Sequence, residues 1–167
     1  MKYGFGVDVG GTTVKIGLFD RTGMLLERFE IPTHTENGGA RILPEIAAAI
    51  EGVLSRRLIA KEDAEGIGVG VPGPVAPDGT VNRCVNLNWG VFNLHKDLGD
   101  LTGLCVKAGN DANCAALGEH WKGGGMGCRS TVFVTLGTGV GGGVIIDGKV
   151  PSRGEVICHV GVGACDM

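Results

Sequence analysis

The chain has 167 residues, including 32 glycines and six cysteines, with 15 basic and 18 acidic side chains and a formal net charge of -3. This length suits one ordinary domain, or one domain and part of a second, and the weak negative charge offers no attraction for nucleic acid or an anionic membrane. No apolar run is long enough to span a bilayer, the N-terminus lacks a signal-peptide core, and the cysteines form no CxxC pair, so we expect reduced thiols and a cytoplasmic location.

The first predicted element is a hairpin over Tyr3–Asp20, in which two apolar runs flank Gly10 and Gly11. Glycine accepts positive φ and lets backbone N–H groups approach a ligand, so this turn, with the Thr12 hydroxyl after it, suits a phosphate. Asp8 stands where a carboxylate orders hydrated Mg²⁺ beside that phosphate. A plain surface hairpin with a solvated Asp8 explains the motif equally well when the motif is taken alone.

Strands and one long helix follow the hairpin. Met24–Ile31 predicts a third antiparallel strand, and the apolar period over Ala40–Leu58 predicts a helix that covers one face of the sheet. Gly66–Val71 is typical of a buried strand parallel to the first, and it leads into a loop at Pro72–Pro74. A short strand or hairpin arm is expected over Gly79–Val85.

The stretch Asn86–Gly90 combines two carboxamides and an indole in one polar loop. Amides pair with hydroxyls and an aromatic face covers C–H groups, which suits a polyol such as a sugar. On spacing alone, a turn with asparagine in left-handed conformations is the better interpretation.

A second strand and helix place a carboxylate at the edge of the sheet. After a short helix over Leu94–Leu101 that ends at Gly103, the strand Cys105–Ala108 runs into Asp111, and a helical run follows. Ligands of parallel α/β sheets gather at the carboxyl ends of the strands. Asp111 is therefore either a catalytic carboxylate or a helix N-cap, and its position alone favours the cap.

The last clear element repeats the design of the first. Gly123–Gly127 sits where a lobe boundary would fall, and Thr131–Leu136 predicts a strand that enters the glycine-rich turn Gly137–Gly143. This second strand–turn–strand unit carries a hydroxyl at Thr138. Two copies of one design favour phosphate binding over a purely structural hairpin.

Taken together, these motifs resemble the bacterial ROK family of sugar kinases, most specifically its glucokinases, within the actin-like ATPase superfamily. The resemblance covers residues 3 to 149, and its five pieces stand in family order. They are DVGGTTVKIGLFD from Asp8, GVGVPGPV from Gly68, VNLNWG from Val85, GNDANCAALGEHWKG from Gly109 and VTLGTGVGGGVIIDGK from Val134.

The resemblance implies an α/β fold of the actin-like (ribonuclease H-like) type. Its first lobe, residues 1–122, would have a mixed sheet flanked by helices, and residues 123–167 would begin a second lobe. Sugar and ATP would bind in the cleft between the lobes.

The resemblance also implies roles for individual residues. Asn110 and Asp111 match the sugar-binding and catalytic pair, and Gly73, Asn86 and Asn88 match positions that line the sugar pocket. The two phosphate loops would consist of Asp8, Gly10, Gly11, Thr12 and the supporting Lys15 in the first lobe, and of Gly137, Thr138 and Gly139 in the second.

The implied reaction is phosphorylation of glucose to glucose 6-phosphate by ATP and Mg²⁺, with Asp111 as general base. The partners would be a hexose and ATP, without nucleic acid or membrane, and the full-length form would be a candidate homodimer. A non-catalytic sugar-binding remnant and a ROK-type sugar-responsive regulator are the alternatives. The regulator is disfavoured because the first phosphate loop begins within the first ten residues, which leaves no room for a helix-turn-helix before it.

The end of the chain departs from the family pattern. Glu155 and His159 are spaced one residue too far apart for the GExGH motif, and Cys158 and Cys165 lack the spacing of a zinc site. A second lobe that starts near Gly123 has too few residues for a core of its own. We therefore expect an incomplete second lobe and little or no kinase activity from this chain alone.

Overall fold

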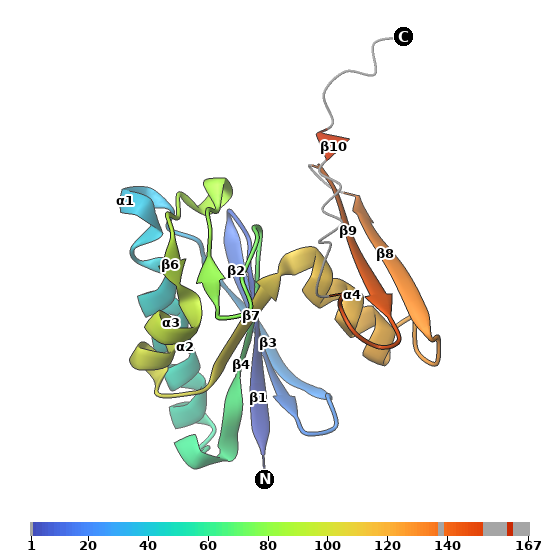
Figure 1. The fold of residues 1–167 in the computed structure, drawn as a ribbon. Coiled ribbons are helices and arrows are strands. Elements are labelled where there is room, and N and C mark those ends of the chain that lie inside the picture. The colour runs from blue at the N-terminus through green and yellow to red at the C-terminus, as the bar shows by residue number, and fades with distance from the viewer. Residues whose placement is uncertain (1, 137–138, 152–159, 162–167) are drawn as a thin grey trace. The chain divides into compact units, whose positions relative to one another are not determined.

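The computed structural model describes residues 2–136, 139–151 and 160–161. The chain divides into two compact units, Met1–Asp111 and Ala112–Met167 (Figure 1). Each unit has its own sheet, and each is described separately below.

The first unit is built on a five-stranded mixed sheet in the order β3-β2-β1-β4-β7. β1 (Tyr3–Val9), β2 (Thr13–Asp20) and β3 (Leu25–Pro32) form the expected antiparallel meander, with Val9 opposite Val14 across the first turn. β4 (Ala64–Val71) pairs parallel to β1, and β7 (Val106–Asn110) pairs parallel to β4. The expected mixed sheet is confirmed.

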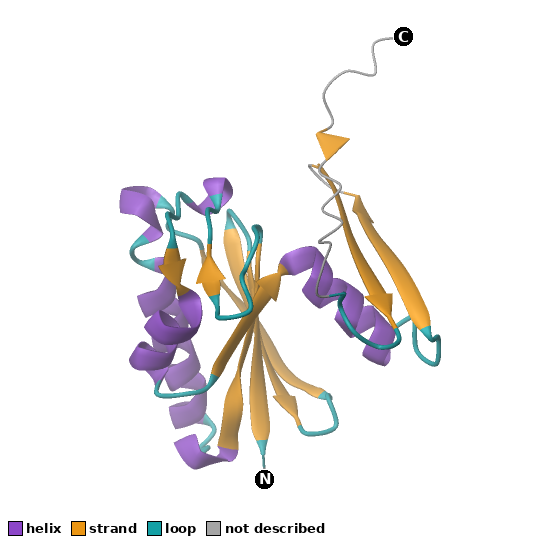
Figure 2. Cartoon of the chain, in the orientation of Figure 1, coloured by secondary structure: helices purple, strands orange, loops and turns teal. Residues whose placement is uncertain are grey.

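Two helices cover one face of this sheet (Figure 2). Helix α3 (Leu94–Thr102) begins after Asn93, whose side chain accepts a hydrogen bond from the Lys96 amide at 2.8 Å, and it is capped at its end by Gly103, whose φ of 66° is left-handed. Both are standard ways to satisfy helix ends. The helices and the smaller elements of the unit are α1 (Glu36–Gly39), α2 (Ile42–Arg56), η1 (Lys61–Asp63), β5 (Thr80–Val81), η2 (Val85–Leu87), β6 (Phe92–Asn93) and α3 (Leu94–Thr102).

The core of the first unit lies between the sheet and α2. The apolar stripe of α2 is fully buried, as its helical period predicts, and it packs on inward-facing strand residues. Burying one such aliphatic side chain is worth about 1.5–3 kcal/mol, so the stripe anchors the helix. The side chains that are almost completely buried include Ile16, Leu18, Ile42, Ile46, Ile50, Leu94 and Leu98.

The second unit joins one helix to an antiparallel hairpin. α4 (Asp111–Lys122) starts at the last residue of the first unit, and β8 (Ser130–Leu136) pairs with β9 (Gly139–Ile146), beside which lies the short β10 (Val160–Gly161). The described contacts thus group the helix with the hairpin, whereas the expected lobe boundary at residue 123 stays a prediction.

Close packing of small residues holds α4 to the hairpin. A side-chain carbon at Gly143 would lie 2.6 Å from the Ala116 Cβ and 2.7 Å from the Ala112 carbonyl oxygen, so only glycine fits there. Across the same contact, His120 Nδ1 and the Thr131 hydroxyl are hydrogen-bonded at 2.8 Å. Part of the glycine density after Leu136 therefore has a structural cause.

The described residues contain no helix that is both long and apolar enough to cross a membrane. Four cysteines fall in the described ranges, and all four are free thiols: Cys84, Cys105, Cys114 and Cys128.

Candidate active site

Three parallel strands bring the predicted catalytic residues to one edge of the first sheet. β1, β4 and β7 run in the same direction, with Asp8 opposite Gly70 and Val71 opposite Asn110 (Figure 1). Their carboxyl ends therefore meet, which is where ligands of parallel sheets bind. Asp8 belongs to the end of β1, and Asp111 follows the end of β7 directly.

Asn110 and Asp111 are held in different environments at this edge. Asn110 is only 6% exposed, and its amide nitrogen donates a long hydrogen bond of 3.5 Å to the Gly73 carbonyl. Asp111 is half-buried and is the first residue of α4, so it is part of the helix and not a cap before it. A carboxylate in the first helical turn is favoured by the helix dipole.

The pKa of Asp8 is shifted by one nearby cation, Lys15, and by a second carboxylate, Asp111. Asp8 is exposed, but the surrounding residues displace part of its hydration and this desolvation raises the pKa of its carboxyl; the Lys15 charge lowers that pKa, and the Asp111 charge raises it. Lys15 is the direct cross-strand partner of Asp8 on β2. Two carboxylates that repel each other at one sheet edge provide the hard oxygen ligands that Mg²⁺ prefers.

The Asp8–Asp111 pair does not make a complete metal site. In the residues that the structure covers, no three His, Cys, Asp or Glu side chains gather closely enough to hold a metal ion. Mg²⁺ would therefore need further oxygen ligands in addition to these two carboxylates.

The first glycine turn requires glycine for lack of space, and not because its backbone is left-handed. Neither Gly10 nor Gly11 has a φ in the left-handed region, so the expected use of positive φ is wrong. A side-chain carbon at Gly10 would lie 2.9 Å from the Thr13 carbonyl oxygen, which accepts a hydrogen bond from the Gly10 amide at 3.0 Å. The tight turn itself requires glycine at position 10.

Thr33 supports the first turn, although the sequence analysis did not single it out. Its hydroxyl donates to the Gly10 carbonyl at 2.7 Å, and its amide donates to the Thr12 carbonyl at 2.9 Å. Two carbonyls of the turn are thereby occupied, while Gly11 and Thr12 stay exposed. The sequence signal was a lone hydroxyl just after the third strand, which is too common to be specific.

The predicted sugar loop lies beside this turn. A side-chain carbon at Gly11 would be 3.5 Å from the Asn86 carbonyl oxygen, so the two segments are neighbours. Asn86 and Asn88 are both exposed, and Asn88 has the left-handed φ of 54° that was weighed as its structural explanation. The side-chain amide nitrogen of Asn88 also donates a hydrogen bond to the Thr35 carbonyl at 3.2 Å, which connects the loop to the segment before α1.

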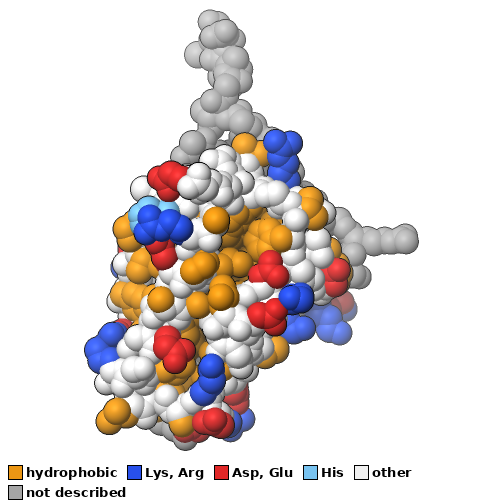
Figure 3. All heavy atoms as spheres, turned by 90° about the vertical axis from the view of Figure 1, so that its left-hand side faces the viewer, with side chains coloured by type: hydrophobic (Ala, Val, Ile, Leu, Met, Phe, Trp, Pro, Cys, Tyr) orange, Lys and Arg blue, Asp and Glu red, His pale blue; other side chains and the backbone are white. Residues whose placement is uncertain are grey.

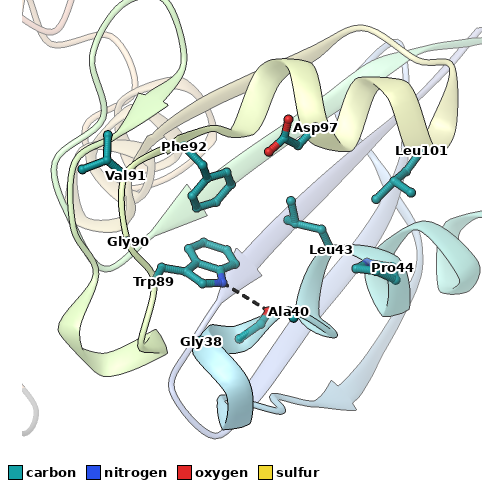
Figure 4. Close-up of a pocket in the computed structure, with 11 residues that line it drawn as sticks. Gly38, Ala40, Leu43, Pro44, Trp89, Gly90, Val91, Phe92, Asp97 and Leu101 are labelled. Atoms are coloured by element: carbon teal, nitrogen blue, oxygen red, sulfur yellow. Dashed lines mark hydrogen bonds between the residues drawn. The ribbon is translucent and has the colours of Figure 1, made fainter.

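Trp89 does not present an aromatic face at the surface. It is 5% exposed, its Nε1 donates to the Gly39 carbonyl at 3.3 Å, and its ring meets Phe92 edge-on at 5.0 Å. It lines an apolar hollow of about 380 Å³ together with Leu43 and Leu101 (Figure 4). The space-filling view shows hydrophobic side chains gathered on this face (Figure 3). None of the predicted sugar or phosphate residues lines this hollow, and the role of the indole in covering a sugar stays a prediction.

Gly73 is buried against a cysteine. A side-chain carbon at Gly73 would lie 2.4 Å from the Cys84 sulfur, which leaves no space for any other residue. Burial, and then the Asp111 charge, raise the pKa of the Cys84 thiol to about 11. The thiol is therefore protonated at neutral pH and acts as an apolar filler beneath the Asn110–Gly73 contact.

The second predicted phosphate loop is only partly described. Gly137 and Thr138 lie outside the described residues, and Gly139 is the first residue of β9. Glu155, Cys158, His159 and Cys165 also lie outside them.

Comparison with known proteins matches the model of the ROK family to residues 4–163. A glucokinase from Halalkalibacterium halodurans is 45% identical over 146 residues, which make up 87% of this chain and 44% of that protein. An N-acetyl-D-glucosamine kinase from Aliivibrio fischeri is 39% identical over 158 residues, covering 89% and 47% of the two chains.

Among solved structures, a ROK family glucokinase from Streptomyces griseus in complex with glucose and AMPPNP superposes with a TM-score of 0.79 and 35% identity. The match covers 94% of this chain and 48% of that one. The chain thus spans about half the length of these relatives.

Proposed function

Because the chain belongs to the ROK family, we propose that it forms the sugar-binding and catalytic part of an ATP-dependent hexose kinase that makes glucose 6-phosphate from glucose. The observation that carries this proposal is the meeting of Asn110, Asp111 and Asp8 at one sheet edge. The Halalkalibacterium halodurans relative is a glucokinase, and the Streptomyces griseus structure contains glucose and AMPPNP. We also propose a cytoplasmic location, in keeping with the free thiols of the described cysteines.

In the proposed reaction, Asp111 acts as general base. Its carboxylate accepts the proton of the primary hydroxyl of the sugar while that oxygen forms a bond to the γ-phosphorus of ATP. The bond from the γ-phosphorus to the bridging oxygen breaks, and ADP leaves with that electron pair. Phosphoryl transfer has a loose transition state, so orientation and charge stabilisation supply most of the catalysis.

The sugar would be oriented by the residues around Asp111. The Asn110 carboxamide is buried and held by the Gly73 carbonyl, so it is a pre-positioned partner for a hydroxyl. Asn86 and Asn88 stand exposed on the neighbouring loop and would contact the remaining hydroxyls.

The ATP phosphates would lie on the first turn, at the amides of Gly11 and Thr12, with Lys15 and Gly10 supporting the turn. Gly137, Thr138 and Gly139 remain the proposed second phosphate loop. Asp8 would hold a water ligand of Mg²⁺, which neutralises charge on the phosphates when bound.

Calorimetry with the purified chain tests the assignment. Glucose should bind to the wild type and to Asp111→Asn, whereas Asn110→Ala should bind at least about tenfold more weakly because a buried amide partner is lost. Transfer of the γ-phosphoryl group from labelled ATP to glucose, measured in parallel, should be ~10²-fold or more slower in Asp111→Asn than in the wild type. Undiminished turnover in Asp111→Asn would refute the role of Asp111.

A panel of hexoses addresses the substrate. Glucose should bind more tightly than N-acetyl-D-glucosamine, because VNLNWG over Val85–Gly90 resembles the glucokinase version of this loop. The similarity to the Aliivibrio fischeri protein makes N-acetyl-D-glucosamine the second candidate. Sugar binding without any ATP-dependent transfer would indicate a non-catalytic sugar-binding protein instead.

A further inference from the structure

His95 lies in the first turn of α3 and is bonded to the edge of the main sheet. Its Nε2 accepts a hydrogen bond from the Ala108 amide at 2.8 Å. Ala108 is on β7, the outer strand, so a ring nitrogen takes the place of a neighbouring strand. Because buried backbone amides need a partner, this bond helps to complete the edge of the sheet.

The other side of the imidazole packs on a turn. Gly79 has a φ of 89°, and a side-chain carbon there would lie 2.1 Å from the His95 ring, so ring and backbone are in direct contact. The Gly79 carbonyl accepts from the Leu94 amide at 2.9 Å, and the Asn93 amide group donates to the Asp78 carbonyl at 3.0 Å. The ring is therefore enclosed between this turn and β7.

This position requires a neutral imidazole. A nitrogen that accepts a hydrogen bond carries no proton, so the single ring proton belongs to Nδ1. His95 is the second residue of the nine-residue helix α3, where the helix dipole disfavours a cation.

The charged neighbours of His95 act in both directions. Burial first, and then the Lys107 ammonium on β7, lower its pKa below the ordinary 6.5, while Asp78 on the turn raises it. On its own helix, the adjacent Lys96 is paired with Asp100 at 2.7 Å.

The two segments that His95 joins are those that carry the candidate sugar residues. We call Thr80–Asn93, which contains β5, the loop with Asn86 and Asn88, and β6, the arm. The turn under the imidazole leads directly into the arm, and Ala108 precedes Asn110 by two residues. The imidazole is thus a short bridge between the arm and the strand that leads to Asp111.

We propose that His95 is a positioning residue, whose neutral imidazole holds the arm against β7 and whose protonation releases it. A proton on Nε2 would point at the Ala108 N–H, so the hydrogen bond would be replaced by two opposed donors. The consequence for sugar affinity, a weakening of about 2- to 10-fold on the loss of one hydrogen bond, rests on the proposed function.

Three variants of the full chain separate this role from a general structural one. His95→Gln keeps an acceptor at a similar reach but does not titrate, and His95→Leu removes the acceptor. His34→Gln is the matched control, because His34 is a half-buried histidine of the same unit that pairs with Glu45 and not with the arm. For each variant, amide exchange by NMR gives the protection factor of Ala108, and calorimetry gives glucose affinity, at about pH 7.5 and about pH 5.

The expected result is specific to the acceptor. In the wild type and in His34→Gln, Ala108 protection and glucose affinity should both fall at the lower pH. In His95→Gln both should stay at their neutral-pH level, and in His95→Leu both should be low throughout. The proposal would be overturned if the protection factor of Ala108 in the wild type did not change with pH. It would also be overturned if protection in His95→Gln fell at low pH as in the wild type, or were low at both pH values as in His95→Leu. If no variant binds glucose at either pH, the proposed function fails, and the Ala108 amide alone still decides the role of His95.

Discussion

Replacing Gly73 by alanine should destabilise the first unit through a clash with essentially one atom. The new carbon would lie 2.4 Å from the Cys84 sulfur and 3.2 Å from the Arg83 carbonyl oxygen, and both Gly73 and Cys84 are buried. Gly73 has no left-handed φ, so the backbone adds no strain of its own. Overpacking of this kind costs about 1–3 kcal/mol in the free energy of unfolding.

The same reasoning predicts that Cys84→Ala rescues the substitution. Alone, Cys84→Ala should cost about 1 kcal/mol because one buried atom is lost. In that background Gly73→Ala fills the vacated space and restricts the unfolded chain, which is worth about 0.4–1 kcal/mol. The effect of Gly73→Ala thus changes sign between the two backgrounds, which corresponds to a favourable coupling of about 1.4–4 kcal/mol.

Urea unfolding, followed by far-UV circular dichroism, would measure the free energy of unfolding of the wild type, the two single variants and the double variant. Gly52→Ala is the control, because Gly52 lies inside α2 with no atom near its side-chain position, and alanine there should stabilise the helix by up to about 1 kcal/mol. If the effects of Gly73→Ala and Cys84→Ala on the free energy of unfolding were additive within about 0.5 kcal/mol, the contact with the Cys84 sulfur would not be the reason that position 73 requires glycine.

Two further substitutions test the carboxylate edge and the second unit. Because desolvation and Asp111 raise the pKa of Asp8, its ionisation should cost stability as the pH rises from 3.8 through the folded-state value, and Asp8→Asn should remove that loss. Thermal unfolding between about pH 3 and about pH 7 would check this, and a variant that is less stable than the wild type at neutral pH would contradict it. Gly143→Ala should weaken amide protection in β8 and β9 by about 1–3 kcal/mol, since its new carbon meets Ala116 and the Ala112 backbone. Gly142→Ala, whose nearest atom would be 3.4 Å away, should leave that protection unchanged or raise it, and equal losses in both variants would contradict the packing argument.

The fold of the first unit was predictable because its signals are local. The apolar period of α2, the alternation on either side of Gly10 and Gly11, and the short apolar run of β4 each identify one element. Parallel strands with helical connections then bring Asp8 and Asp111 to one edge. The edge site follows from element order alone, before any side-chain contact is known.

The contacts that shape the site were not predictable, because each joins residues that are distant in sequence. Trp89 follows two polar asparagines, and nothing in that loop indicates that its indole turns inward to the Gly39 carbonyl, 50 residues earlier. The bond from the Ala108 amide to His95 spans 13 residues and depends on how α3 meets the sheet edge. Single residues that act through such contacts have no spacing pattern to identify them.

The two glycine-rich segments look alike in sequence but differ in the structure, because Gly139 to Gly143 of the second segment, predicted as part of a turn, belong to strand β9. In the second segment, the missing side chain of Gly143 lets α4 pack closely against the strand. Helix packing therefore explains one of the glycines of this segment without any ligand. In the first, Gly10 is required by the turn, whereas Gly11 is exposed and its nearest neighbour is the Asn86 loop. Packing therefore does not require glycine at position 11, and its exposed backbone is where the proposed phosphate would approach. The case for phosphate binding therefore rests more on Gly11 and Thr12 than on the number of glycines that follow Leu136.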